Sequence, residues 1–274
     1  MSRLLHAGAY RLKKSKVHWI SLAAIVGYGA FIYILQYYNM EKYHFEMELE
    51  SSFFQPLMLM GIVTAVFVSL SVGTEYSDGT IRNKLVIGMS RTEIYLSNFV
   101  LQIVSAVGIV LCTYLLGCVL GIPLLGAPNI SAGMMAQICV VGILFCIAYV
   151  SIFNMITMNV ASKANAAVIC ILLAIGMMLV SSYLLNCLNQ PKYIDQAVMK
   201  NGQVVIETVK NQYYLTGMKR QIYQNVSEIF PSGQGMYVAG MQIINPVRMM
   251  IYSVIVTVVT TVCGMVLFQK KDIK

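Results

Sequence analysis

The sequence contains little charge. Only 11% of its 274 residues are charged and 58% are hydrophobic, whereas charged residues make up about a quarter of an ordinary soluble domain. This composition excludes an ordinary soluble domain and indicates an integral membrane protein. The net charge is +8, but the basic residues stand in the gaps between apolar runs. Their spacing favours a role in membrane orientation, and we expect no nucleic-acid partner.

The patterns that catalysis and metal binding require are also missing. There is no phosphate-binding Gly-x-x-x-x-Gly-Lys-Ser/Thr loop, so we expect that this chain does not hydrolyse ATP itself. The seven cysteines include no Cys-x-x-Cys pair, and His6, His18 and His44 lack the spacing of metal ligands. We therefore predict no enzyme activity and no catalytic, cofactor-binding or metal-binding residue in this chain.

Six apolar runs are each long enough to cross a bilayer, which takes about 20 residues. No Asp, Glu, Lys, Arg or His lies in the middle of a run, which argues against a proton- or ion-driven carrier. We predict an all-α integral membrane fold with six transmembrane helices in a single domain, 1–274, and expect Gly121 and Pro123 to close the third span. The spans are 17–36, 53–72, 94–120, 134–158, 166–185 and 247–268.

The basic residues predict the orientation. Most of them lie in the short segments 1–16, 73–93, 159–165 and 269–274, while the short segments on the opposite side carry only Lys42. Because short cytoplasmic segments are enriched in Lys and Arg, we expect both chain ends to be cytoplasmic. The expected location is a bacterial plasma membrane.

Three elements outside the spans have their own signatures. Residues 1–16 alternate basic and apolar side chains, which predicts an interfacial helix held by lipid headgroups. The extracellular segment 186–246 contains two strand-like runs around Asn201-Gly202, a strong signal for a small β-hairpin. Residues 229–244 are apolar but too short to span, which favours a re-entrant segment before the last span over a helix resting on the surface.

The cytoplasmic region 73–93 is predicted to form a short helix between two long ones. Asp78 is placed to cap its first turn, and Gly88 is the residue type that ends a helix in the left-handed conformation. Ser90 and Glu93 have the spacing of a capping box, which begins the next long helix.

The short helix is amphipathic. Ile81 and Leu85 lie one turn apart on one face, while Arg82 and Lys84 point elsewhere. Such a helix lying on the membrane surface has the shape of a lever that a partner could push. The alternative is an ordinary connecting loop.

Residues 75–97, EYSDGTIRNKLVIGMSRTEIYLS, resemble the coupling region of bacterial exporter-type ATP-binding-cassette (ABC) permeases. The ending LFQKKDIK and the PSGQ at Pro231–Gln234 are also similar to that family, as is the six-span layout. The resemblance implies a permease that works as a homo- or heterodimer above two cytoplasmic ATPase subunits. ATP and Mg²⁺ would bind those partners, leaving no cofactor in this chain.

The resemblance also implies which residues face the ATPase. Ile81 and Leu85 would fill an apolar groove on it, and Arg82, Lys84 and Arg91 would supply salt-sensitive pairing. The full set of expected coupling residues is Glu75, Asp78, Gly79, Thr80, Ile81, Arg82, Asn83, Lys84, Leu85 and Arg91.

Few polar residues lie within the spans. Asn154, Thr157 and Asn159 cluster near one end of the fourth span and are the candidate substrate path, although such residues also join helices by hydrogen bonds. We expect export of an apolar or amphipathic substrate such as a peptide, drug or lipid-like molecule. The alternative is a sensing or immunity protein that binds an extracellular peptide through residues 186–246 without transporting it.

Overall fold

The computed structural model describes residues 2–44, 48–200 and 203–271 of the chain. Within these ranges, six helical segments are long and apolar enough to cross a membrane. The predicted all-α membrane fold with six spans is thereby confirmed. The segments are α2 (Lys16–Tyr43), α3 to α4 (Leu49–Ser77), α6 to α7 (Arg91–Leu125), α8 (Ala132–Asn159), α9 (Lys163–Leu188) and α12 (Pro246–Lys270).

Two of the six segments are interrupted. The second consists of α3 (Leu49–Phe54), a 3-10 turn (Gln55–Leu59) and α4 (Met60–Ser77). The third consists of α6 (Arg91–Leu116), a π-helical turn (Gly117–Gly121) and α7 (Ile122–Leu125). The helix therefore continues past Gly121 and Pro123, where we predicted its end. Pro123 lies in the first turn of α7, where its missing N–H is not needed, and the chain turns away at Gly126.

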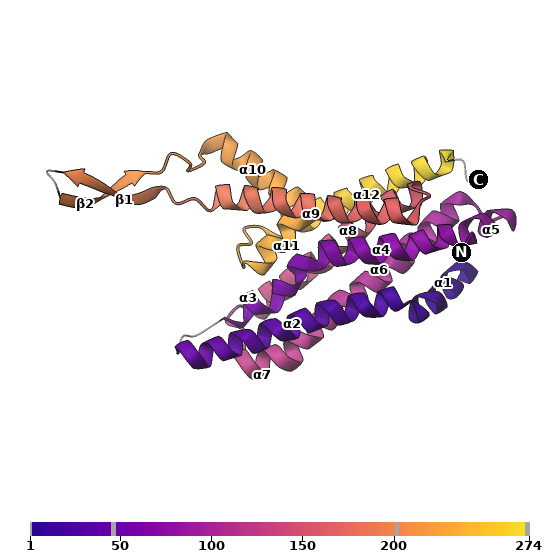
Figure 1. The fold of residues 1–274 in the computed structure, drawn as a ribbon, viewed down its shortest axis with the longest axis horizontal. Helices are drawn as coiled ribbons and strands as arrows, with labels where there is room; N and C mark the ends of the chain where they lie inside the picture. Colours follow the sequence, from indigo (N-terminus) through magenta and orange to yellow (C-terminus); the bar gives the residue numbers. More distant parts are fainter. Residues whose placement is uncertain (1, 45–47, 201–202, 272–274) are drawn as a thin grey trace.

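The two ends of the bundle differ (Figure 1). Both chain ends lie at one end together with α1 (Ser2–Lys14) and the short helix α5 (Thr80–Val86), and we call this the terminal end. A β-hairpin projects from the opposite end, the hairpin end. The predicted helix at residues 1–16 is present as α1, and it bends into α2 at Ser15, whose hydroxyl accepts from the backbone N–H of His18.

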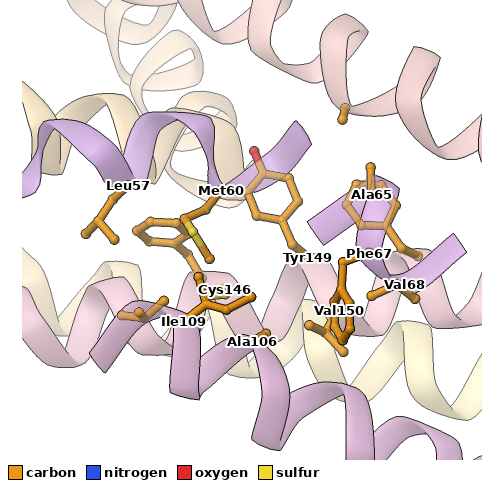
Figure 2. Close-up of a cluster of buried hydrophobic side chains, with 14 of the residues drawn as sticks. Leu57, Met60, Ala65, Phe67, Val68, Ala106, Ile109, Cys146, Tyr149 and Val150 are labelled. Atoms are coloured by element: carbon orange, nitrogen blue, oxygen red, sulfur yellow. The ribbon is translucent and has the colours of Figure 1, made fainter. Parts of the chain in front are cut away.

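The core lies between α4, α6 and α8. Figure 2 shows side chains of these helices packed together, among them Phe67 of α4, Ile109 of α6 and Tyr149 of α8. In the most apolar stretches of the second and fourth spans, 56% and 61% of the residues are buried, against 28%, 28% and 22% for α2, α9 and α12. The central helices α4 and α8 are therefore covered by protein, while α2, α9 and α12 keep broad apolar faces for lipid or a partner.

The predicted hairpin is confirmed. β1 (Tyr193–Lys200) and β2 (Gln203–Lys210) pair antiparallel from Tyr193 opposite Lys210 to Lys200 opposite Gln203. Asn201 and Gly202, the predicted turn, lie outside the described residues. The hairpin extends away from the helices (Figure 1).

Two short helices, α10 (Gly217–Ile229) and α11 (Pro231–Ala239), form a corner after the hairpin. Most of α11 is buried, and the Ser232 hydroxyl donates to the carbonyl oxygen of Met177 at 2.9 Å. Met177 precedes Leu188, the last residue of α9, by eleven residues, or about 16 Å at a rise of 1.5 Å per residue. The corner thus reaches well inside the bundle, as expected for a re-entrant segment and not for a helix resting on the surface.

Gly233 allows this corner to close. An ideal Cβ at Gly233 would overlap the backbone carbonyl oxygen of Ser227 in α10, which cannot rotate away. We expect Gly233→Ala to lower the thermal unfolding midpoint in detergent, at a cost of about 1–3 kcal/mol, the range for overpacking. Gly133→Ala at the start of α8 is the matched control, because a Cβ there meets nothing within 4 Å. Equal midpoints for the two variants would contradict this role.

Candidate functional site

Glu75, near the end of α4, is a buried carboxylate that joins four helices. It is 4% exposed, and it accepts hydrogen bonds from Arg11 of α1, from Lys84 of α5 at 2.7 Å and from Asn98 of α6 at 3.1 Å. A buried carboxylate is costly unless it is paired, and here two cations and an amide pair it. Glu75 therefore holds α1, α5 and α6 to the end of α4.

A tight turn leads from α4 into α5. Asp78 follows α4 as its C-cap, and Gly79 stands at the N-cap of α5 with φ of 66°, a left-handed conformation that suits glycine. The prediction that Asp78 caps the short helix is therefore wrong, and the Asp78 side chain is exposed. The Thr80 hydroxyl ties the turn together by donating to the carbonyl oxygen of Glu75 at 2.9 Å.

The exit from α5 has the predicted form. Gly88 is left-handed, with φ of 85°, and its N–H donates to the carbonyl oxygen of Leu85 at 3.0 Å. Ser90 and Glu93 form the predicted capping box, with both of its hydrogen bonds present at the start of α6.

The face of α5 that carries Ile81 and Leu85 points into the protein, whereas we predicted that it faces a partner. Ile81 is 1% exposed and belongs to the buried core, and Leu85 packs partly buried against that core. The prediction that this pair fills a groove on a partner is therefore wrong for Ile81. The exposed apolar side chains come later, at Val86 and Ile87, which are 79% and 71% exposed. We call the exposed residues here the α5 surface: Arg82, Asn83, Val86 and Ile87.

Arg91 also bonds within the chain. Its guanidinium donates to the carbonyl oxygens of Phe268 at 3.1 Å, of Gln269 at 3.2 Å, and of Lys271. A cation is favourable at a helix C-terminus, where the last carbonyls lack partners inside the helix. Arg91 therefore fastens the end of α12 to the start of α6, and its contact with an ATPase stays a prediction.

Lys271 completes the same junction. Its ammonium donates to the Tyr76 hydroxyl at 3.0 Å and to the carbonyl oxygen of Met158 at 3.2 Å, and it lies 4.3 Å from the centre of the Tyr76 ring. Partial burial disfavours the charged form and lowers the pKa of Lys271 to about 8. The ends of α4, α8 and α12 thus meet around this residue.

The lowered pKa predicts a pH dependence of stability. Below about pH 8, Lys271 is charged in both the folded and the unfolded chain, so the full cost of burying the charge is present. Between that pKa and the usual value of 10.5, the folded chain has released the proton and the unfolded chain has not, so this contribution to stability rises with pH. We expect Lys271→Met to remove the rise, measured by unfolding midpoints at about pH 7.5 and about pH 9.5. If the unfolding midpoint changes by the same amount between these two pH values in Lys271→Met and in the unmodified protein, this assignment is contradicted.

The candidate substrate path falls in the packed part of α8. Asn154 and Thr157 are fully buried, and the Thr157 hydroxyl donates to the carbonyl oxygen of Phe153 at 2.7 Å. Asn159 donates to the carbonyl oxygen of Gly264 in α12 at 3.3 Å, so it joins two helices. The buried side-chain amide of Asn154 interacts with the hydroxyl of Tyr95 in α6. A substrate contact therefore stays a prediction for all three residues.

A second polar cluster, which we did not predict, lies at the hairpin end. Glu228 of α10 is 2% exposed and pairs with Arg248 of α12, whose Nε donates to it at 2.6 Å. The side chain of Gln234 in α11 donates to the carbonyl oxygens of Glu228 at 2.7 Å and of Met249 at 3.1 Å. It also accepts from the Ser253 hydroxyl at 2.7 Å. These bonds fix the α10–α11 corner to α12.

Several residues of the terminal-end site were missed from the sequence, chiefly Arg11, Asn98 and the pair Val86 and Ile87. A local signal existed only for the pair, because two apolar residues follow Leu85 in a segment that is otherwise polar. Arg11 and Asn98 are 64 and 23 residues from Glu75, and no local pattern connects them to it.

The fold and the site together define a multi-pass membrane protein whose terminal end is built around a short exposed helix. Residues 14–273 match the ABC-2 family transporter protein family, so nearly the whole chain is covered. The chain belongs to this family, and it is a permease subunit of a membrane transporter. The comparison with curated proteins gave no match.

Proposed function

We propose that this chain is the permease subunit of an ATP-driven exporter and that a separate ABC ATPase subunit binds the α5 surface. The observation that carries the proposal is the exposed pair Val86 and Ile87 beside Arg82 and Asn83. An apolar centre with a polar rim is the usual anatomy of a protein interface. Ile81 anchors the same helix in the core, so the surface is presented on a fixed support.

The contacts of Glu75 and Arg91 supply a route for force in this proposal. A push on α5 acts through Lys84 on Glu75 and so on α1, α4 and α6 together. Arg91 carries the same displacement to the end of α12. Closure of the ATPases on ATP would in this way tilt the spans that surround the transport path. Glu75 and Arg91 act inside the permease, while the α5 surface meets the partner.

The proposed orientation places the terminal end in the cytoplasm of a bacterial cell and the β-hairpin outside it. The basic residues of α1, α5 and the end of α12 support it, because short cytoplasmic segments are enriched in Lys and Arg. ATP and Mg²⁺ would then bind the ATPase, and this chain would supply no catalytic group.

The proposed transporter contains two permease chains, identical or different, surrounded by membrane lipid. The apolar faces of α2, α9 and α12 offer surface for contact with the second permease chain and with lipid. The proposed cargo is apolar or amphipathic, because the sequence places no Asp, Glu, Lys, Arg or His in the middle of a span, where a charged cargo would need a counter-charge.

The test is purification of the tagged chain from its native membranes in mild detergent, followed by identification of the associated proteins. We expect an ABC ATPase and ATP hydrolysis in the purified complex. Recovery of a histidine kinase or an extracellular peptide without an ATPase would overturn the proposal in favour of a sensing or immunity protein.

A further inference from the structure

A continuous apolar groove runs between α2 and α6. It consists of two cavities of about 500 Å³ and about 490 Å³ that share Trp19, Leu22 and Cys112 as lining residues. Gly108 lies in its floor, where an added Cβ would meet nothing within 4 Å. The two helices thus leave a space between them that no side chain of the described residues fills at this point.

The groove is long enough for an acyl chain. Along the third span its lining extends from Leu101 of α6 to Val119 of the π-helical turn. This is about 27 Å at a rise of 1.5 Å per residue, close to the thickness of about 30 Å of the hydrocarbon core. The polar side chains His18 and Ser105 face each other within its wall, with 2.6 Å between Nδ1 and Oγ. This contact occupies the Ser105 hydroxyl and one ring nitrogen of His18, and most of the other lining side chains are apolar.

One cation lies at the end of the groove nearest α1. Lys13 lines the groove there, whereas Arg11, Lys14 and Lys16 line a separate cavity with Glu75 and Asp78. The Trp19 indole N–H donates to the carbonyl oxygen of Lys13 at 2.8 Å, which fixes an aromatic ring at the junction of the basic and apolar parts. Tryptophan is enriched at the level of lipid headgroups.

We propose that the α2–α6 groove binds one anionic phospholipid, with an acyl chain along the groove and the phosphate at Lys13. The combination of a cation at one end and a long apolar groove matches a molecule that is anionic at one end and apolar along the rest. A lipid without net charge offers Lys13 a weaker counter-charge, and an apolar helix of a second copy offers none. The inference does not depend on the transport direction or on the ATPase.

Trp19 is a built-in reporter, because the chain has one tryptophan and it lines both cavities. The protein is reconstituted into phosphatidylcholine bilayers that contain increasing fractions of phosphatidylglycerol with brominated acyl chains, which quench indole fluorescence on contact. Brominated phosphatidylcholine is the comparison lipid. We expect brominated phosphatidylglycerol to reach half of its maximal quenching of Trp19 at a several-fold lower fraction of the total lipid than brominated phosphatidylcholine does. We expect Lys13→Gln to reduce that preference about fivefold, the factor for one basic residue at an anionic surface.

A pair of glycine variants separates the groove from the general lipid-facing surface. Gly108→Phe fills the groove and is expected to abolish the preference for phosphatidylglycerol. Gly27→Phe in α2 is the control, because it is exposed, a Cβ there also meets nothing within 4 Å, and it does not line the two cavities. It should leave the preference intact. Equal quenching by both lipids in the unmodified protein would overturn the proposal. So would protection of Trp19 from both lipids in a dimer, which would assign the groove to a second copy.

Discussion

Replacing Glu75 by alanine is expected to loosen the terminal end and to lower the free energy of unfolding by about 2 kcal/mol, because hydrogen bonds to charged groups contribute about 1.5–3 kcal/mol each and part of this is recovered by hydration. The Glu75 side chain is 5% exposed, while its partners Arg11 and Lys84 are 43% and 17% exposed. The loss therefore falls mostly on Lys84 and Asn98, which are left with unpaired donors in a covered position. Arg11 can turn to water.

Limited trypsin digestion in detergent measures this loosening directly. The bonds after Arg11, Lys13 and Lys14 in α1 should be cut faster in Glu75→Ala, and the unfolding midpoint should fall. Asp78→Asn is the matched control, since it removes a carboxylate three residues away that is exposed. If the two variants resist trypsin equally, Glu75 does not hold α1 in place.

Replacing both Val86 and Ile87 by aspartate is expected to abolish binding of the ATPase while the permease stays folded. These side chains are exposed in the single chain, so the change leaves the fold intact, whereas it puts two charges into an apolar contact of the complex. Burying an unpaired charge is far more costly than burying an apolar group. The measurement is the yield of ATPase that co-purifies with the tagged variant.

Two further variants make this result specific. Ile206→Asp in the β-hairpin is the matched control, because Ile206 is 72% exposed and Ile87 is 71% exposed. It should leave the yield of ATPase unchanged. Ile81→Asp should instead lower the amount of folded permease, because Ile81 is in the core. Normal co-purification from the Val86 and Ile87 variant would place the partner elsewhere.

Local patterns predicted most of the fold. The six spans follow from apolar runs of membrane length, and the capping box at Ser90 and Glu93 and the left-handed Gly88 follow from residue types at short spacing. Each of these signals lies within a few residues of the feature that it predicts. The β-hairpin between Tyr193 and Lys210 was found in the same way.

The site could be predicted only in part, because its contacts join distant segments. The periodicity of α5 identifies an apolar face through Ile81, but it does not say whether that face turns to the core or to a partner. The face with Ile81 belongs to the core, and α5 contacts α4 and α6. The link from Glu75 to Arg11 and the link from Arg91 to the end of α12 depend on how whole helices pack. The resemblance to ABC permeases assigned Ile81 to an ATPase interface, whereas the structure places Ile81 in the core.

Photo-crosslinking can identify what binds the proposed ATPase-binding α5 surface. A photo-crosslinking amino acid is placed at position 87 in native membranes, with position 206 in the β-hairpin as the comparison. We expect a crosslinked product of this chain with an ABC ATPase from position 87 and none from position 206. A product from position 87 that contains no ATPase, in cells that produce one, would show that the α5 surface binds a different partner.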